Sequence, residues 1–129
     1  MKEYVSVDVE TTGLAPKQDK IIAIGAVRVR AGQIVGRFTS FVTPGRILPA
    51  HITELTGILQ EQVDEAETME SVLPAFLEFA GDLPLMGHRI LFDYGFLKRA
   101  AVNMRLDFER SGVDTLKLSR QFLSELPSR

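Results

Sequence analysis

Two acidic residues, Asp8 and Glu10, stand one residue apart at the end of an apolar segment near the start of the 129-residue sequence. In a β-strand, residues i and i+2 point to the same face, so these carboxylates would be neighbours about 7 Å apart. Two partly desolvated anions repel each other unless a proton or a cation lies between them. Carboxylate oxygens favour Mg²⁺ or Mn²⁺ over zinc, so the pair predicts a divalent-metal site. The alternative is a strand end whose acids are solvated in a turn.

The elements that would position these acids follow from the periodicity of the chain. Alternation over residues 4–9 predicts a first strand, and residues 20–30 and 33–42 predict a hairpin about the turn Ala31-Gly32. Further along, the pattern predicts helices over residues 51–59, 68–80, 92–103 and 115–126, with buried strands at 83–87 and 111–114. Pro74, near the start of the second helix, is expected to limit where that helix begins.

This order of elements predicts an α/β fold. Three consecutive strands followed by alternating helices and strands are typical of a mixed sheet, antiparallel on one side and parallel on the other, flanked by helices. The first strand, which carries the two acids, would lie in the centre of the sheet. At 129 residues the chain fits a single domain, spanning residues 1–129.

The composition is that of a globular protein and narrows the possible chemistry. Hydrophobic residues make up 45% of the chain and charged residues 25%, with a formal net charge of −2. The absence of cysteine excludes disulfides, thiolate metal sites and cysteine nucleophiles. The N-terminal residues run straight into strand-like sequence, and no window approaches 18 consecutive apolar residues. We therefore expect a cytoplasmic protein that does not enter a membrane.

The charges are unevenly distributed. Residues 47–88 contain no Lys or Arg but eight acidic residues, whereas Arg89 opens a segment rich in cations. Attraction for a nucleic acid backbone would therefore come from the segment after residue 88 or from the first 46 residues. The alternative is that these charges are only solvated helix faces.

Two segments together resemble a known family. Residues 6–14 (SVDVETTGL) and 87–97 (GHRILFDYGFL) are similar to the first and second motifs of the DEDD, or DnaQ-like, 3′-to-5′ exonucleases, such as the proofreading domains of the bacterial DNA polymerase III epsilon type. Residues 52–58 and 113–116 resemble two further landmarks of the family, in the expected order. The sequence departs from the family at Arg89, where Asn is usual. The resemblance implies a ribonuclease H-like fold.

The resemblance also implies an activity and a set of site residues. Asp8, Glu10 and Asp93 would hold two Mg²⁺ or Mn²⁺ ions that promote hydrolysis of a single-stranded or frayed DNA 3′ end, releasing nucleoside monophosphates. The terminal nucleotide would contact a further set of residues, namely Thr12, Gly13, Leu14, His88 and Phe92. For Leu14 and Phe92 core packing is the alternative. For His88 the alternatives are hydrogen bonds at a strand end, a metal contact, and a substitute base.

A third family motif, a His followed five residues later by an Asp, has no counterpart after Asp114 in this sequence. The fold is therefore expected to be C-terminally truncated, the second metal ion to bind weakly, and nuclease activity to be impaired. Two functional classes remain, a proofreading exonuclease that works in DNA replication and a noncatalytic binding or assembly module of the same fold. Expected partners are a single-stranded 3′ end and a DNA polymerase or helicase. Uncovered apolar surface would favour a homodimer.

Overall fold

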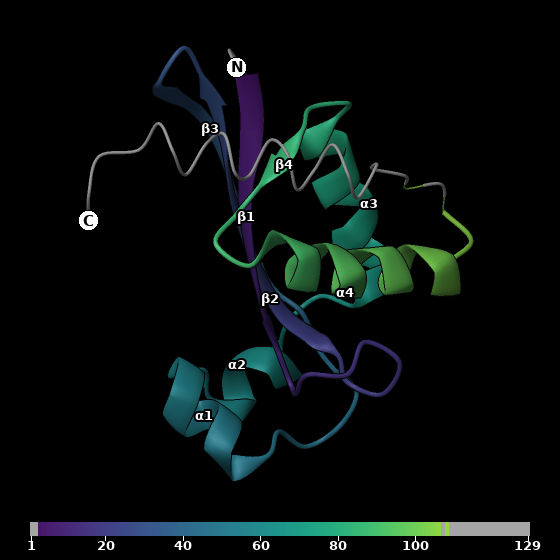
Figure 1. Ribbon diagram of the computed structural model, residues 1–129. Helices are drawn as coiled ribbons and strands as arrows, with labels where there is room; N and C mark the ends of the chain where they lie inside the picture. Colours follow the sequence, from purple (N-terminus) through teal and green to yellow (C-terminus); the bar gives the residue numbers. More distant parts are fainter. Residues whose placement is uncertain (1–2, 107, 109–129) are drawn as a thin grey trace.

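The computed structural model describes residues 3–106 and residue 108 of the chain, which form one mixed sheet with helices around it (Figure 1). The strands are β1 (Glu3–Thr11), β2 (Ile21–Arg30), β3 (Gln33–Phe41) and β4 (Leu85–Met86), in the spatial order β3-β2-β1-β4. β1 pairs antiparallel with β2 and parallel with β4, and β2 pairs antiparallel with β3. β1 therefore lies inside the sheet, with a neighbour on each side, as the sequence predicts.

Alternation along β1 sets which face of the sheet is buried. Val5, Val7 and Val9 are buried, whereas Asp8 between them is exposed. A one-residue shift in register would exchange these two sets of side chains, so the pairing of Val7 with Ala26 and of Val9 with Ile24 is strongly specified. The hairpin of β2 and β3 closes through the two-residue turn Ala31-Gly32, since Arg30 pairs with Gln33.

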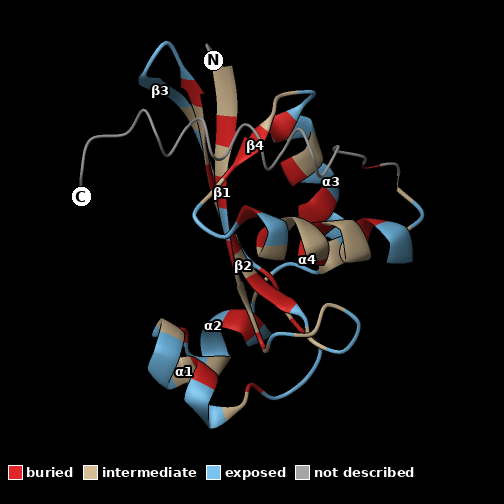
Figure 2. Cartoon of the chain, viewed as in Figure 1, coloured by how far each residue is buried: buried red, intermediate tan, exposed pale blue. Residues whose placement is uncertain are grey.

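In the part of the chain that the structure describes, four helices follow the hairpin, in two groups. α1 (Ala50–Thr56) and α2 (Gln60–Asp64) lie together near the end of β1, whereas α3 (Met69–Ala80) and α4 (Ile90–Asn103) pack beside each other against the sheet (Figure 1). The buried sides of α3 and α4 and the valines of β1 form the larger hydrophobic cluster, which includes Phe76 and Leu97. Buried segments of these three elements are red in Figure 2. A second cluster joins Ile22 to the two short helices.

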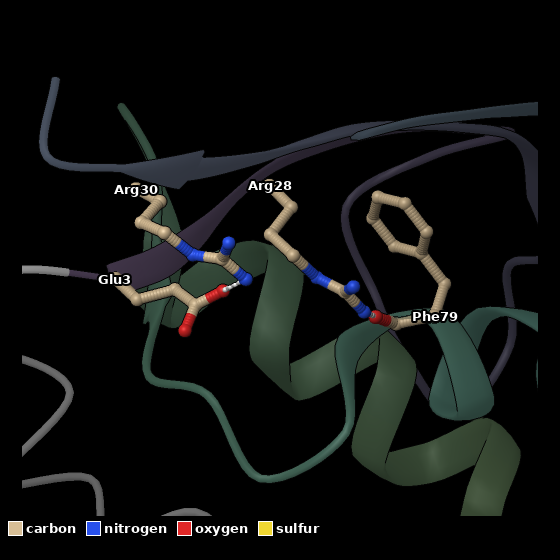
Figure 3. Close-up of polar contacts among 4 residues, drawn as sticks. All are labelled: Glu3, Arg28, Arg30 and Phe79. Carbon is tan, nitrogen blue, oxygen red and sulfur yellow. Dashed lines mark hydrogen bonds and ion pairs between the residues drawn. The ribbon is translucent and has the colours of Figure 1, made fainter. Parts of the chain in front are cut away.

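The C-terminal end of α3 is bound to the sheet by Arg28 of β2. The guanidinium of Arg28 donates a hydrogen bond to the backbone carbonyl of Phe79 and lies 5.0 Å from the centre of the Phe79 ring (Figure 3). This carbonyl is one of the last in the helix, which have no intrahelical partner, and a cation there also complements the helix dipole. The neighbouring Arg30 forms an ion pair with Glu3 at 3.2 Å on the surface (Figure 3).

The structure confirms the mixed α/β sheet and refines several elements. The prediction for Pro74 is wrong, because α3 begins at Met69 and Pro74 lies exposed inside it. The strand over residues 83–87 shortens to two residues, and α2 was not predicted. The strand and helix predicted for residues 111–126 lie outside the described residues. Within the described part of the chain, every helix is too short or too polar to span a lipid bilayer.

Candidate active site

The two acids of the first motif lie on β1, where the strand passes the end of β4. Among the described residues, β4 pairs with β1 at Val5 and Ser6, and no strand covers that edge of β1 beyond Ser6. The Val5 amide donates to the Pro84 carbonyl at 2.9 Å, and the amides of Val7 and Val9 face the same edge. Asp8 is exposed and Glu10 is partly buried. The strand therefore presents two accessible carboxylates beside this edge of the sheet.

Asp93 comes to this edge from α4. A Cβ on Gly87 would lie 2.7 Å from the Val7 carbonyl oxygen, so only glycine lets the chain leave β4 so close to β1. α4 then begins at Ile90, and Asp93 lies in its first turn with 2% of its surface exposed. The Asp93 carboxylate accepts a hydrogen bond from the Val9 backbone, which takes the place of a strand partner there. Residues far apart in the sequence thus meet at one edge of the sheet.

The charges of the three acids act on one another. Burial, followed by the charge of Asp8, raises the pKa of Asp93 to about 7. The same two causes, in the same order, raise the pKa of Glu10. The cation Arg89 opposes both shifts. The site therefore carries more negative charge than its surroundings compensate, which is the condition under which a cation binds.

The residues present fit a divalent metal ion in chemistry. All three donors are carboxylates, which suit Mg²⁺ or Mn²⁺. Asp93 Oδ2 is buried without a hydrogen-bond partner and is therefore free to act as a ligand. Over residues 3–106 and 108, however, no three acidic or histidine side chains are gathered closely enough to hold an ion as they stand. For one ion to contact all three acids, Asp8 and Glu10, on the accessible side, would have to move toward Asp93.

The loop after β1 is braced by a residue that the sequence analysis did not single out, Asp19. One of its carboxylate oxygens accepts from the Thr12 hydroxyl at 3.2 Å, and the other accepts from the Ala15 amide at 3.0 Å. The Thr12 hydroxyl, which is buried, also accepts from the Lys20 amide at 2.9 Å. Thr12 therefore supports the loop through its side chain. An acid within the β1–β2 connection, two residues before β2 begins, is the signal that could have identified Asp19.

The remaining candidates for nucleotide contact differ in exposure. Leu14 is 76% exposed on the braced loop, so it is free of the core packing that was its alternative. Phe92 is partly buried against the large hydrophobic cluster, and its ring centre lies 5.0 Å from that of Phe96. His88 is exposed in the turn between β4 and α4. Arg89, noted in the sequence as a departure from the motif and as the start of a cation-rich segment, lies close enough for its charge to act on Glu10 and Asp93.

Sequence comparison identifies the family to which this arrangement belongs. The profile described as "Exonuclease" matches residues 5–129. The chain belongs to the exonuclease family. Within that family it is a DEDD exonuclease with a ribonuclease H-like fold.

Relatives within the exonuclease family are much longer than this chain. It is 44% identical over 124 residues to the PolC-type DNA polymerase III of Clostridium perfringens, covering 96% of the chain but 9% of that protein. It is 42% identical over 134 residues to a putative bifunctional exonuclease/endonuclease protein of Mycobacterium tuberculosis, covering 97% of the chain and 21% of the relative.

Solved structures agree on the fold of this exonuclease domain. Escherichia coli exonuclease I in complex with a dT13 oligonucleotide superposes with a TM-score of 0.73 at 15% identity, covering 83% of this chain and 25% of the other. At that identity the likeness concerns the fold, and it supports the ribonuclease H-like architecture.

The braced loop gives a first testable prediction, the substitution Gly13→Ala. A Cβ at this position would overlap the atoms of the Asp19 carboxylate. Asp19 would have to turn away and give up its hydrogen bonds to Thr12 and Ala15, at a cost of about 1–3 kcal/mol. We expect the free energy of unfolding in urea to fall by that amount.

Gly95→Ala is the matched control. The nearest atom to a Cβ there is Pro16 Cγ at 3.9 Å, an ordinary contact, and Gly95 lies inside α4. Alanine at this helical position is expected to stabilise the protein by about 0.5–1 kcal/mol. Equal effects of the two substitutions would contradict the bracing role of Asp19.

Proposed function

We propose that this chain is a metal-dependent 3′-to-5′ exonuclease that acts on single-stranded or frayed DNA 3′ ends, in the manner of a proofreading domain. The observation that carries the proposal is the meeting of Asp8, Glu10 and Asp93 at one edge of the sheet, with Asp93 buried and its Oδ2 unpartnered. A buried carboxylate with one oxygen left unpartnered beside two other acids costs stability, so it calls for a functional explanation.

Each of the three acids has a role in this proposal. Asp8, Glu10 and Asp93 would hold the divalent ions, Mg²⁺ or Mn²⁺, as carboxylate ligands. When bound, such ions supply Lewis acidity to the scissile phosphate and an activated water. Asp93 is buried in the first turn of α4 and is held by a hydrogen bond from the Val9 backbone, so it would be the fixed ligand of the site. Asp8 and Glu10 are more accessible and would approach the ion from the solvent side.

The substrate would lie against the loop and the start of α4. Leu14, held outward by the braced loop, is placed to contact an unstacked terminal base, and apolar contact of this kind needs no sequence code. Gly13 lets the backbone of the loop approach the nucleotide, and Phe92 offers a ring at the start of α4. His88, exposed in the turn before α4, is a candidate for contact with phosphate.

The names of the relatives support the choice of substrate. Over 96% of its own length, this chain resembles a segment of PolC-type DNA polymerase III. This resemblance favours DNA as the substrate and a polymerase as the partner. The oligonucleotide in the exonuclease I complex is single-stranded thymidine, consistent with action on an unpaired end.

A second candidate is a noncatalytic module that keeps the fold and binds without hydrolysis. It is favoured by the finding that, in the described part of the chain, the acids are not gathered closely enough to hold an ion as they stand. A domain with this role would bind a strand or a partner protein and would form no product.

Release of mononucleotides separates the two candidates. A single-stranded oligonucleotide labelled at its 3′ end is incubated with the protein and Mn²⁺, and the labelled product is resolved from the substrate. We expect a labelled mononucleotide as the first product, lost with Asp8→Ala or with a chelator, and retained with the exposed control Asp64→Ala. Binding of the strand without Mn²⁺-dependent release would favour the noncatalytic module.

A further inference from the structure

Arg89 is held at the start of α4 by an aromatic ring. It is the residue immediately before the helix, its carbonyl accepts the Asp93 amide at 3.0 Å, and its side chain makes no capping hydrogen bond. The guanidinium carbon lies 4.1 Å from the centre of the Phe92 ring, and that ring packs on Phe96. Arg89 is nonetheless exposed. The contact with Phe92 therefore orients a cation that remains accessible from solvent.

The same guanidinium lies beside the acids without being paired to them. Its charge acts on both Glu10 and Asp93. Among the residues that the structure describes, however, the one ion pair between side chains joins Arg30 to Glu3, at 3.2 Å. Arg89 is thus close enough to influence the carboxylates, and its hydrogen-bond donors are not used by them. An oriented guanidinium next to an acidic metal site is suited to an anion that enters that site.

We propose that Arg89 is a substrate-binding residue that contacts a phosphodiester group of the nucleic acid strand at the acidic site, with Phe92 holding its guanidinium in place. This inference rests on the proposed function and adds a residue to it. A guanidinium binds phosphate with two parallel hydrogen bonds, and stacking on an aromatic ring leaves those donors free at the edge.

The need for such a cation follows from the charge around the site. Three carboxylates repel a polyanion, and residues 47–88, which lead up to the site, contain no Lys or Arg. Arg89 is the first cation after that stretch and lies four residues before Asp93, one turn of helix away. A nucleic acid strand whose 3′ end enters the acidic site would therefore pass close to the Arg89 guanidinium.

The salt dependence of binding measures the contact. Affinity of a fluorescent single-stranded oligonucleotide is determined by anisotropy over a range of salt concentrations, in Ca²⁺, with the intactness of the strand checked afterwards. Each phosphate contact contributes about 0.7 to the slope of log K against log salt for single strands. We expect Arg89→Gln to lower the slope by about that amount and Arg89→Lys to retain it. The control Arg37→Gln, an exposed arginine on β3, should leave the slope unchanged.

Neutral linkages then locate the contacted phosphate. Oligonucleotides carrying one methylphosphonate linkage are compared at successive positions from the 3′ end. With the wild-type protein, one position near the 3′ end should weaken binding severalfold, and with Arg89→Gln the same position should have little further effect. An equal loss for both proteins at every position, or an unchanged salt slope for Arg89→Gln, would overturn the proposal.

The outcomes also distinguish this inference from the proposed function. If the wild type and Arg89→Gln release nucleotides and bind strands alike, the exonuclease proposal stands and the role of Arg89 falls. If the wild type neither binds a single strand nor releases nucleotides, both fall. Binding that depends on Arg89 without any release would support the phosphate contact and favour the noncatalytic module.

Discussion

Replacing Asp93 with asparagine is expected to reduce Mn²⁺-dependent nucleotide release by ~100-fold or more while stabilising the metal-free protein at neutral pH. Asparagine has nearly the same shape and keeps a carbonyl oxygen to accept the hydrogen bond from the Val9 backbone. It lacks the charge that a divalent ion requires. It also removes a buried charge whose Oδ2 has no hydrogen-bond partner. Activity and stability should therefore change in opposite directions.

The stability effect has a defined pH dependence. Burial and the charge of Asp8 raise the pKa of Asp93 from the ordinary 3.8 to about 7 in the folded state. Between these values the folded protein binds a proton that the unfolded chain does not, so stability falls as pH rises, by up to about 1.4 kcal/mol per unit for this group. Below pH 3.8 the contribution of protonated Asp93 to the free energy of unfolding is fully present. Above pH 7 this contribution is lost, and stability no longer depends on pH through this group. Urea unfolding in a chelator at several pH values measures this slope.

Asp82→Asn is the matched control, since Asp82 is an exposed aspartate in the turn after α3. It should change neither the nucleotide release nor the difference in stability between pH 5 and pH 8. If Asp93→Asn lowers stability at pH 8, then Asp93 is not a destabilising buried charge. If Asp93→Asn leaves the release intact, then Asp93 is not a metal ligand in the reaction.

The sequence predicts those parts of the fold that have a clear period. Alternation of valines with Ser6 and Asp8 identifies β1, and the Ala31-Gly32 turn identifies the hairpin. Short elements without a period escape such reasoning. α2 has five residues and buries only Val63, and β4 pairs over two residues, so each depends on tertiary contacts rather than on a local pattern.

The site shows a similar division. Asp8 and Glu10 stand out because charge interrupts an apolar strand, and Asp93 is identified only through its resemblance to a motif. Asp19 and Arg89 are common residue types, and the sequence alone assigns a role to neither of them. Their significance comes from a hydrogen-bonded loop and from a ring 4.1 Å away, which only the folded chain brings together.

Affinity for Mn²⁺ is expected to rise about tenfold per pH unit from pH 5 to pH 7 and then to level off. In this range the metal must displace the proton that burial and Asp8 retain on Asp93 by raising its pKa to about 7. Titration calorimetry at a series of pH values gives the affinity. Repeating it in two buffers of different ionisation enthalpy gives the number of protons released, which should approach one below pH 7. Asp93→Asn should bind more weakly, with little pH dependence.

This titration also tests whether Asp93 binds the ion together with Asp8 and Glu10. For one ion to contact all three acids, Asp8 and Glu10 would have to approach Asp93, because the three side chains are not gathered closely enough to hold an ion as they stand in the described chain. That approach brings carboxylates of like charge together, so the ion, rather than the protein alone, completes the geometry. Affinity that is independent of pH, with no proton released, would mean that Asp93 takes no part and that the ion is held elsewhere.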